Sequence, residues 1–370
     1  MKTIISIICI SCFFLMTSFC QAADTIKIAA AFAKTGKASK TGSDYFQGVQ
    51  FTVDEINEQG GLIGKKLELL EFDNKSTPLG AKAVAKKAVK AGVVAVIGAV
   101  WSSHSLAMAP VLQEAKIPMI SPASTNPEVT LVGDYIFRVC FIDSFQGSVM
   151  ATFAINDLRA KKAAVLTNTS SGYSVGLAKA FVQSFREQGR EFLWEGDYLD
   201  NETDFSPLLE KVRMLQPDVC FVPGYRRDSA LIIRQARKMG LTTVFLGGDG
   251  WTDMYKYAGK ELHGNYFSEH WHIDMTNRVS REFVKRYQKK HDKVKASHML
   301  SYDAVSLLAD AIRRANSSVP DRIRDAIAAT RNFQGTTGNI TMNQNGDPVK
   351  SAVVLKFDRG TEVYVKTVEP

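Results

Sequence analysis

The chain has 370 residues, of which 45% are hydrophobic and 23% charged, and its formal net charge is +8. This length is enough for two domains with a core each, and the composition is that of a globular protein, which excludes a disordered or collagen-like chain. The basic residues are spread along helix-like segments and do not gather into a patch with aromatic residues, so we expect no nucleic-acid partner.

The first residues have the pattern of a secretory signal peptide. Lys2 supplies a positive charge, residues 4–14 form an apolar run, and small and polar residues follow. We therefore predict a signal peptide over residues 1–22, cleaved after Ala22 or, as the alternative, after Ala23, and a periplasmic mature protein. The apolar run is shorter than the ~20 residues of a spanning helix, which disfavours a membrane anchor.

The cysteines leave two alternatives open. Cys20 is a candidate for a lipid anchor, although the bulky Phe19 in front of it disfavours one. Beyond the expected leader only Cys140 and Cys220 remain, and both lie in apolar, strand-like runs. We interpret them as buried free thiols, and a disulfide between them is the alternative.

After the leader, short β-rich runs alternate with amphipathic helical patterns, which is typical of βαβ units with parallel sheets. A first series predicts strands at 25–31, 67–72, 93–97 and 117–121, and helices at 43–59, from Thr77–Pro78 onward and at 103–115. A second series predicts strands at 163–167, 192–198, 219–222 and 243–246, and helices at 144–158, 174–188, 205–215 and 228–239. Further helices at 278–291, 297–315 and 321–330 precede strands at 340–342, 353–357 and 362–366. We therefore expect an α/β fold of two doubly wound, parallel-sheet lobes, joined by short crossing strands because no flexible linker is evident.

Ligands of open parallel sheets bind beyond the carboxyl ends of the strands, so the residues that follow each strand are the candidate binding residues. After the third expected strand, Gly98 permits close backbone approach, and Ser102 and Ser103 stand where a helix begins. Free N–H groups and hydroxyls at a helix start form an anion site, although the serines alternatively only cap the helix. The next strand ends in loop 121–127, whose N–H groups and Thr125 hydroxyl would serve the same anion.

The strands of the second series end on different side chains, namely Tyr173, Tyr225, Asp249 and Trp251. A carboxylate flanked by aromatic rings suits an ammonium group, through ion pairing and cation–π attraction. For Asp249 the alternative is a turn residue between glycines. A carboxylate site in one lobe and an ammonium site in the other together describe an α-amino acid bound in the cleft between the lobes.

Short motifs follow one another in a characteristic order along the chain: Asp54–Asn57 with Gly60–Leu67, Val96–Gly98, Ile120–Glu128, Tyr173 with Gly176–Ala178, Asp204–Phe205, Gly224–Tyr225 and Ile232–Arg237. On these motifs, from about Thr25 to the C-terminus, the chain resembles the type I periplasmic solute-binding proteins of ABC importers, in particular the leucine/isoleucine/valine-binding group. The resemblance implies that Ser102, Ala123 and Thr125 bind the ligand carboxylate and that Tyr173, Tyr225 and Asp249 surround its ammonium group.

The resemblance also implies a domain arrangement, with crossings near Asp143, His270 and Ser351. The first lobe would then comprise residues 24–143 and 270–351, and the second lobe residues 144–269 and 352–370.

The chain departs from the pattern of this group around the ligand side chain. Ser76 and Trp101 stand where some relatives have a disulfide, Thr41 stands where one has a tyrosine, and the acid is Asp249 instead of a glutamate. We expect Trp101 and Trp251 to border the side-chain pocket. The identity of the amino acid cannot be carried over from the resemblance.

The implied function is the substrate-binding component of an amino-acid ABC transporter of the branched-chain type, which delivers its ligand to an inner-membrane permease. We expect a monomer without cofactor or metal; the alternative is a sensor module that presents its closed form to a membrane receptor. An enzyme is not expected, because neither a nucleophile–base pair nor a G-x-G-x-x-G fingerprint stands out. His270 and His272 could share a strand face as metal ligands, but a surface or crossing position is the preferred interpretation.

Overall fold

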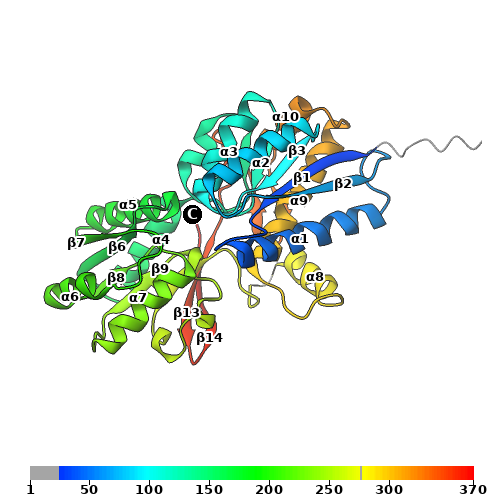
Figure 1. Ribbon diagram of the computed structural model, residues 1–370. Helices are drawn as coiled ribbons and strands as arrows, with labels where there is room; N and C mark the ends of the chain where they lie inside the picture. Colours follow the sequence, from blue (N-terminus) through cyan, green and yellow to red (C-terminus); the bar gives the residue numbers. More distant parts are fainter. Residues whose placement is uncertain (1–24, 276) are drawn as a thin grey trace, which may run out of the picture.

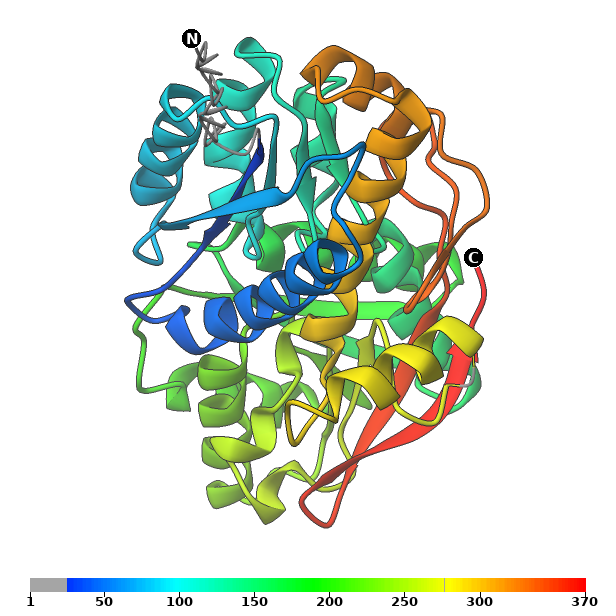
Figure 2. The ribbon, with the colours of Figure 1, turned by 90° about the vertical axis from the view of Figure 1, so that its right-hand side faces the viewer.

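The computed structural model describes residues 25–275 and 277–370, which form two α/β lobes (Figures 1 and 2). Each lobe is built on one main sheet, and helices cover both faces of each sheet. The expected fold class is therefore confirmed. The expected signal peptide, residues 1–22, lies outside the described residues, and so does its cleavage site. Within the described part of the chain, no helix combines the length and the apolarity needed to cross a membrane.

The first lobe holds a parallel sheet with the strand order β2-β1-β3-β4-β5: Leu67–Asp73, Ile26–Phe32, Ala95–Gly98, Met119–Ser121 and Ile136–Arg138. Alternate side chains of β1 enter the two cores, with Ile28 on one face and Ala29 on the other. Both sets are apolar because both faces are covered. One face carries α1 (Ser39–Glu58), α9 (Ala296–Ala315) and α10 (Pro320–Ala328), and the other carries α2 (Pro78–Lys90) and α3 (Ser102–Glu114).

The second lobe holds a seven-stranded sheet with the order β14-β13-β10-β9-β8-β6-β7. These strands are Thr361–Val368, Ala352–Asp358, Tyr266–Glu269, Val244–Gly247, Val219–Phe221, Lys162–Asn168 and Glu191–Tyr198. Pairing is parallel from β10 to β7, whereas β13 and β14 add an antiparallel ribbon at one edge. Residues of α4 (Asp143–Asn156) and α5 (Gly172–Glu187) pack in one core, and those of α6 (Ser206–Leu215) and α7 (Arg226–Lys238) pack in the other.

The chain crosses between the lobes after β5, after β10 and before β13. Between the last two crossings it forms α8 (Arg278–Tyr287), α9, α10 and the hairpin of β11 (Phe333–Gly335) and β12 (Gly338–Ile340). In α8, Phe283 and Tyr287 pack against Phe51 of α1, which fixes this helix to the first lobe.

Local chemistry explains several element boundaries. The expected start at Thr77–Pro78 is confirmed, because the Thr77 hydroxyl accepts from the Gly80 N–H at 2.9 Å and Pro78 occupies the first turn. Strand β10 was not expected from the sequence, although it supplies a carboxylate to the cleft. Cys140 lies two residues beyond β5 and not within a strand. Both Cys140 and Cys220 are buried free thiols, as expected.

Candidate functional site

The first wall of the cleft is the N-terminus of α3. Trp101 is the N-cap residue, and its side chain makes no capping hydrogen bond. Ser102 and Ser103 lie within the helix and do not cap it, so the alternative that these serines only cap the helix is wrong. The N–H groups of Ser102 and Ser103 have no acceptor among the described residues and remain available to an anion, whereas the His104 N–H donates to the Trp101 carbonyl at 2.9 Å. Ser102 is 1% exposed and lines the cleft, and its hydroxyl accepts only a long hydrogen bond of 3.3 Å from the Asn126 N–H.

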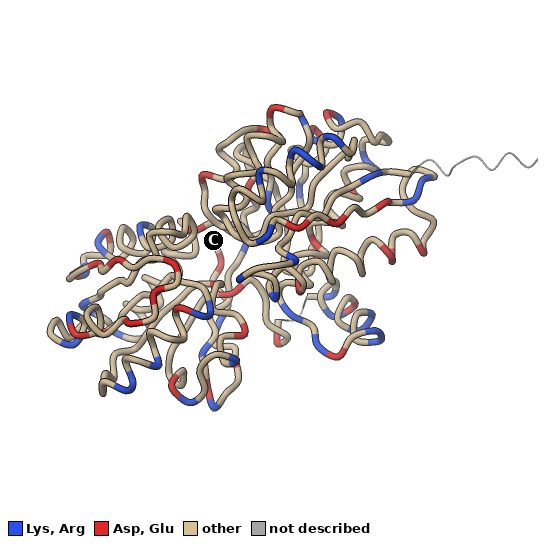
Figure 3. The backbone as a smooth tube through the Cα atoms, in the orientation of Figure 1, with Lys and Arg blue, Asp and Glu red and all other residues tan. Residues whose placement is uncertain are grey.

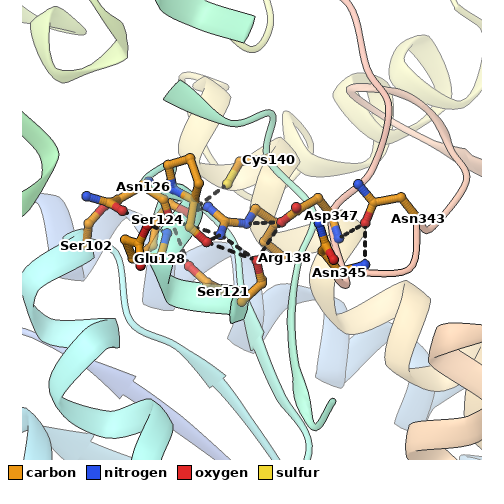
Figure 4. A network of polar contacts seen from close by, with 12 residues as sticks. Ser102, Ser121, Ser124, Asn126, Glu128, Arg138, Cys140, Asn343, Asn345 and Asp347 are labelled. Carbon is orange, nitrogen blue, oxygen red and sulfur yellow. Dashed lines mark hydrogen bonds and ion pairs between the residues drawn. The ribbon is translucent and has the colours of Figure 1, made fainter. Parts of the chain in front are cut away.

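The loop after β4 lies beside this helix start and is fixed by hydrogen bonds of its serines (Figure 4). Ser121 accepts from the Ser124 N–H at 2.8 Å, and the Ser124 hydroxyl donates to the Val100 carbonyl at 2.9 Å. Ala123 lines the cleft. Thr125 is fully buried, its carbonyl accepts from the Asp143 N–H at 2.9 Å, and its hydroxyl lies close enough to the Asp143 carboxyl group to lower the pKa of that group as a hydrogen-bond partner. The loop is therefore fixed, and its threonine adjoins the buried Asp143.

Arg138 of β5 is the residue that fixes this loop, and sequence reasoning missed it. Its side chain is fully buried, and its guanidinium donates to the carbonyls of Ser124 and Asn126 (Figure 4). The Nε atom lies 2.7 Å from a carboxylate oxygen of Asp347, which balances the buried charge. A charged residue inside an apolar strand was the available indication, because such a residue is seldom buried without a partner.

The second wall is centred on Asp249, which follows β9 at the start of a short 3-10 turn, Asp249–Trp251. Its side chain accepts from Gln146 Nε2 at 3.0 Å and lies 3.2 Å from His270 Nε2. Asp249 is therefore oriented by α4 and by the chain just after β10, which goes beyond the role of a turn residue. Tyr173 is buried beside it, and its hydroxyl accepts from the Gly250 N–H at 3.1 Å.

Aromatic side chains join the two walls. Trp101 of the first lobe stacks on Tyr225 of the second, with ring centroids 4.3 Å apart and ring planes 15° apart. Tyr225 in turn stacks on Tyr173 at 5.2 Å. Polar contacts also cross the cleft: Arg226 donates to the Thr41 hydroxyl at 2.9 Å. The lobes therefore touch each other directly around the site.

The structure brings most of the sequence-predicted residues to one cleft, which Ser102, Ala123, Tyr173, Tyr225, Asp249 and Trp101 all line. Thr125 and Trp251 are the exceptions: Thr125 is fully buried and does not line the cleft, and the expected place of Trp251 at the side-chain pocket is wrong. Its ring is fully buried in the core of the second lobe, where the indole N–H donates to the Val222 carbonyl at 3.0 Å. Gly247 leaves room for the ring because it has no side chain, and a Cβ at this position would lie 2.2 Å from the ring.

The two histidines considered as metal ligands do not work together. His270 is buried against Asp249, whereas His272 pairs with Asp274 and stacks on Tyr364. Over residues 25–275 and 277–370, no group of His, Cys, Asp and Glu side chains is arranged to hold a metal ion.

Two buried acids, Asp143 and Glu269, accompany the partly buried Asp249 at the centre of the site. Asp143, where α4 begins, has a pKa raised to about 8 by burial, and the charge of Asp249 adds to this shift. Glu269, the last residue of β10, lines the cleft, and its pKa is raised well above the usual value, first by burial and then by Asp249. Lysines and acids are otherwise interspersed over both lobes (Figure 3), as the scattered charge of the sequence predicted. The cleft centre therefore has an acidic character.

The sequence matches the periplasmic binding protein family over residues 25–362. It is 30% identical over 337 residues, which is 89% of each chain, to the leucine-, isoleucine-, valine-, threonine- and alanine-binding protein of Pseudomonas aeruginosa. The structure resembles the leucine-binding protein LivK of Thermotoga maritima with a TM-score of 0.90 and 38% identity, over 94% of this chain and 99% of that one. It resembles the isoleucine complex of LivJ from Streptococcus pneumoniae with a TM-score of 0.88 and 30% identity, over 94% and 100%.

These likenesses run through nearly the whole described chain, and they confirm the family expected from the motifs. The family consists of solute-binding proteins and not of enzymes, and membership implies a periplasmic location. The chain belongs to the periplasmic binding proteins of type I, and within them to the leucine/isoleucine/valine-binding family.

Proposed function

We propose that this protein is the periplasmic substrate-binding component of an ABC importer for α-amino acids, of the class that includes branched-chain importers. It would leave the cytoplasm with a signal peptide cleaved after Ala22, act as a monomer and deliver its ligand to an inner-membrane permease. Relatives with names that refer to leucine, isoleucine and valine support this class of ligand.

One observation carries the proposal: the two walls of the cleft have opposite polarity. The first lobe offers the N–H groups of Ser102 and Ser103 at the start of α3 and the hydroxyl of Ser102, which suit a carboxylate, and the loop of the buried Thr125 lies beside them. The second lobe offers the Asp249 carboxylate in the same cleft as the stacked rings of Tyr173 and Tyr225, and a carboxylate with aromatic neighbours suits an ammonium group. An α-amino acid that bridges the walls would hold the lobes together.

A binding screen tests the proposal directly. The mature protein is heated with single amino acids, and also with benzoate and simple amines, which each supply only one of the two charges. We expect only ligands with both groups to raise the melting temperature by several degrees, because a ligand that binds only the folded state stabilises it. A response to benzoate equal to that of the best amino acid would contradict the ammonium site.

Asp249→Asn gives the matching mutational test. The amide keeps the shape of the side chain and loses the charge, so we expect affinity for the best amino acid to fall about 30-fold or more by calorimetry. Asp292→Asn, at an exposed position, is the control and should bind like the wild type. Unchanged affinity in Asp249→Asn would remove this residue from the site.

The sensor alternative has the same ligand and differs only in the membrane partner. Reconstitution with the importer subunits distinguishes the two, because only a transport component should raise ligand-dependent ATP hydrolysis and uptake into vesicles.

A further inference from the structure

Glu269 is a cleft-lining carboxylate that the proposed binding of an α-amino acid leaves unused. Its side chain is 2% exposed. One oxygen accepts from the His270 N–H at 2.7 Å, and the other accepts from the Thr252 hydroxyl. The same Thr252 hydroxyl reaches the Asp249 carbonyl at 2.8 Å, so the two acids are neighbours at the carboxyl ends of β9 and β10. Both contacts of Glu269 are with neutral donors.

No cation in the described part of the chain compensates Glu269. The lysines that line the cleft are occupied elsewhere: Lys37 pairs with Asp200, Lys40 with Asp44, and Lys295 with Asp44 and Asp253. Arg226 donates to the Thr41 hydroxyl. A buried carboxylate without a cation is costly to keep ionised, which agrees with its raised pKa. An α-ammonium group at Asp249 would satisfy one of the two acids and leave the other.

The surroundings of Glu269 suit a cation with an aliphatic stem. Tyr45 of α1 is 8% exposed and lines the cleft from the first lobe, and its hydroxyl has no hydrogen-bond partner among the described residues. Tyr45, Asp249 and Glu269 all line the cleft, and burial, followed by the charges of Glu269 and Asp249, raises the pKa of the Tyr45 hydroxyl. Trp101 and Tyr225 line the same cleft as a stacked pair with ring centroids 4.3 Å apart, and Lys37 Nζ lies 5.4 Å from the centre of the Trp101 ring. Aromatic faces with a carboxylate at their end bind cationic nitrogen groups.

We propose that the side chain of the bound amino acid carries a cationic nitrogen, which Glu269 holds against the aromatic lining of the cleft. Basic α-amino acids are then the substrate class, and Glu269 is the residue that selects them. This inference rests on the proposed function, since it assumes that the α-carboxylate and α-ammonium groups occupy the two walls.

The test compares ligands of equal shape. L-ornithine and L-norleucine differ by a terminal ammonium in place of a methyl group, so their affinity ratio, measured by calorimetry, isolates the charge. We expect the wild type to prefer ornithine by about tenfold or more. In Glu269→Gln the amide oxygen can accept from the His270 N–H and the amide nitrogen can donate to the Thr252 hydroxyl, so the side chain stays in place without its charge. This variant should lose the preference while its affinity for norleucine stays within about threefold. Repeating the titrations in buffers of different ionisation enthalpy should show more proton release with ornithine than with norleucine.

The outcomes separate the two proposals. If no amino acid binds, the proposed function fails. If amino acids bind but the wild type prefers norleucine or leucine, the function stands and the assignment of Glu269 is wrong. Tighter binding of L-glutamate would also overturn it, because Arg226 would then receive the side chain. A preference for ornithine that survives in Glu269→Gln would place the cation elsewhere. Circular dichroism of Glu269→Gln confirms that the variant is folded before these comparisons are made.

Discussion

Asp143 is a buried acid whose protonation should affect the stability of the protein. It is 0% exposed, and burial raises its pKa from 3.8 to about 8, although a hydrogen bond with Thr125 acts in the opposite direction. Between these values the folded state binds a proton that the unfolded state lacks. The contribution of Asp143 is therefore fully present below pH 4 and declines as pH rises towards 8, by about 1.4 kcal/mol per pH unit.

Asp143→Asn should remove this decline. We expect the variant to match the wild type near pH 4 and to exceed its free energy of unfolding at pH 8 to 9, because the amide never ionises. Urea unfolding from pH 4 to pH 9 measures the difference, with Asp292→Asn as an exposed control. Parallel pH profiles for Asp143→Asn and the wild type would show that the carboxyl group ionises in the folded state without cost.

The site residues that sequence reasoning found share one property: they follow a predicted strand. Ser102, Thr125 and Asp249 could be predicted as site residues from their position after a strand. Glu269 was missed because the strand that it ends, β10, has only four residues and was not recognised. Trp251 was misplaced because position alone cannot tell a cleft from a core. The 3-10 turn directs its ring inward to a space that Gly247 leaves free.

At the scale of elements, β5 connects the loop after β4, residues 121–127, with the segment of the first lobe that contains Asp347. Arg138 reaches from this strand to two loop carbonyls and to Asp347, and none of these contacts is local in the sequence. The strands predicted from apolar runs agree with the observed strands to within a few residues, because a strand that is buried on both faces has a continuous apolar run in its sequence. Long-range polar clamps such as Arg138 are not periodic and could not be predicted.

Arg138→Met should destabilise the protein through this clamp. Removing the cation leaves Asp347, 4% exposed, without its charge partner, and loss of one member of a buried ion pair typically costs about 3–5 kcal/mol. We expect a loss of this size in urea unfolding. Arg138→Met with Asp347→Asn should recover part of it, because no isolated charge remains. A double variant that is less stable than the single one would indicate that Asp347 is stabilised by its other contacts.

At the scale of the whole molecule, the lobes are held face to face by polar contacts at the mouth of the cleft as well as by rings inside it. Lys295 of the first lobe lies 2.7 Å from Asp44 on its own lobe and 2.9 Å from Asp253 on the other. Asn126 donates across to the Gly172 carbonyl at 2.6 Å. Local sequence patterns predicted two series of βα units, but which lobe receives α8, α9 and α10 depends on packing between distant segments. Only the family resemblance indicated that arrangement.

Lys295→Met should favour an open arrangement of the lobes, because the ion pair with Asp253 exists only while the lobes meet. A hinge motion that separates the lobes would break this pair, and weakening the closed form lowers apparent affinity for any ligand that requires it. We expect a larger radius of gyration without ligand in small-angle X-ray scattering, return to the wild-type value at saturating ligand, and affinity about three- to tenfold weaker.

Lys40→Met is the matched control for this prediction. Lys40 also pairs with Asp44, at 2.7 Å, but both residues lie on α1, so the variant removes an ion pair of the same acid without touching the contact between lobes. If the two variants have the same radius of gyration and the same affinity, the Lys295–Asp253 pair does not contribute to closure. If only Lys295→Met changes both quantities, this largely buried ion pair stabilises the closed arrangement of the lobes, and in its absence the ligand has to supply correspondingly more binding free energy to close the cleft.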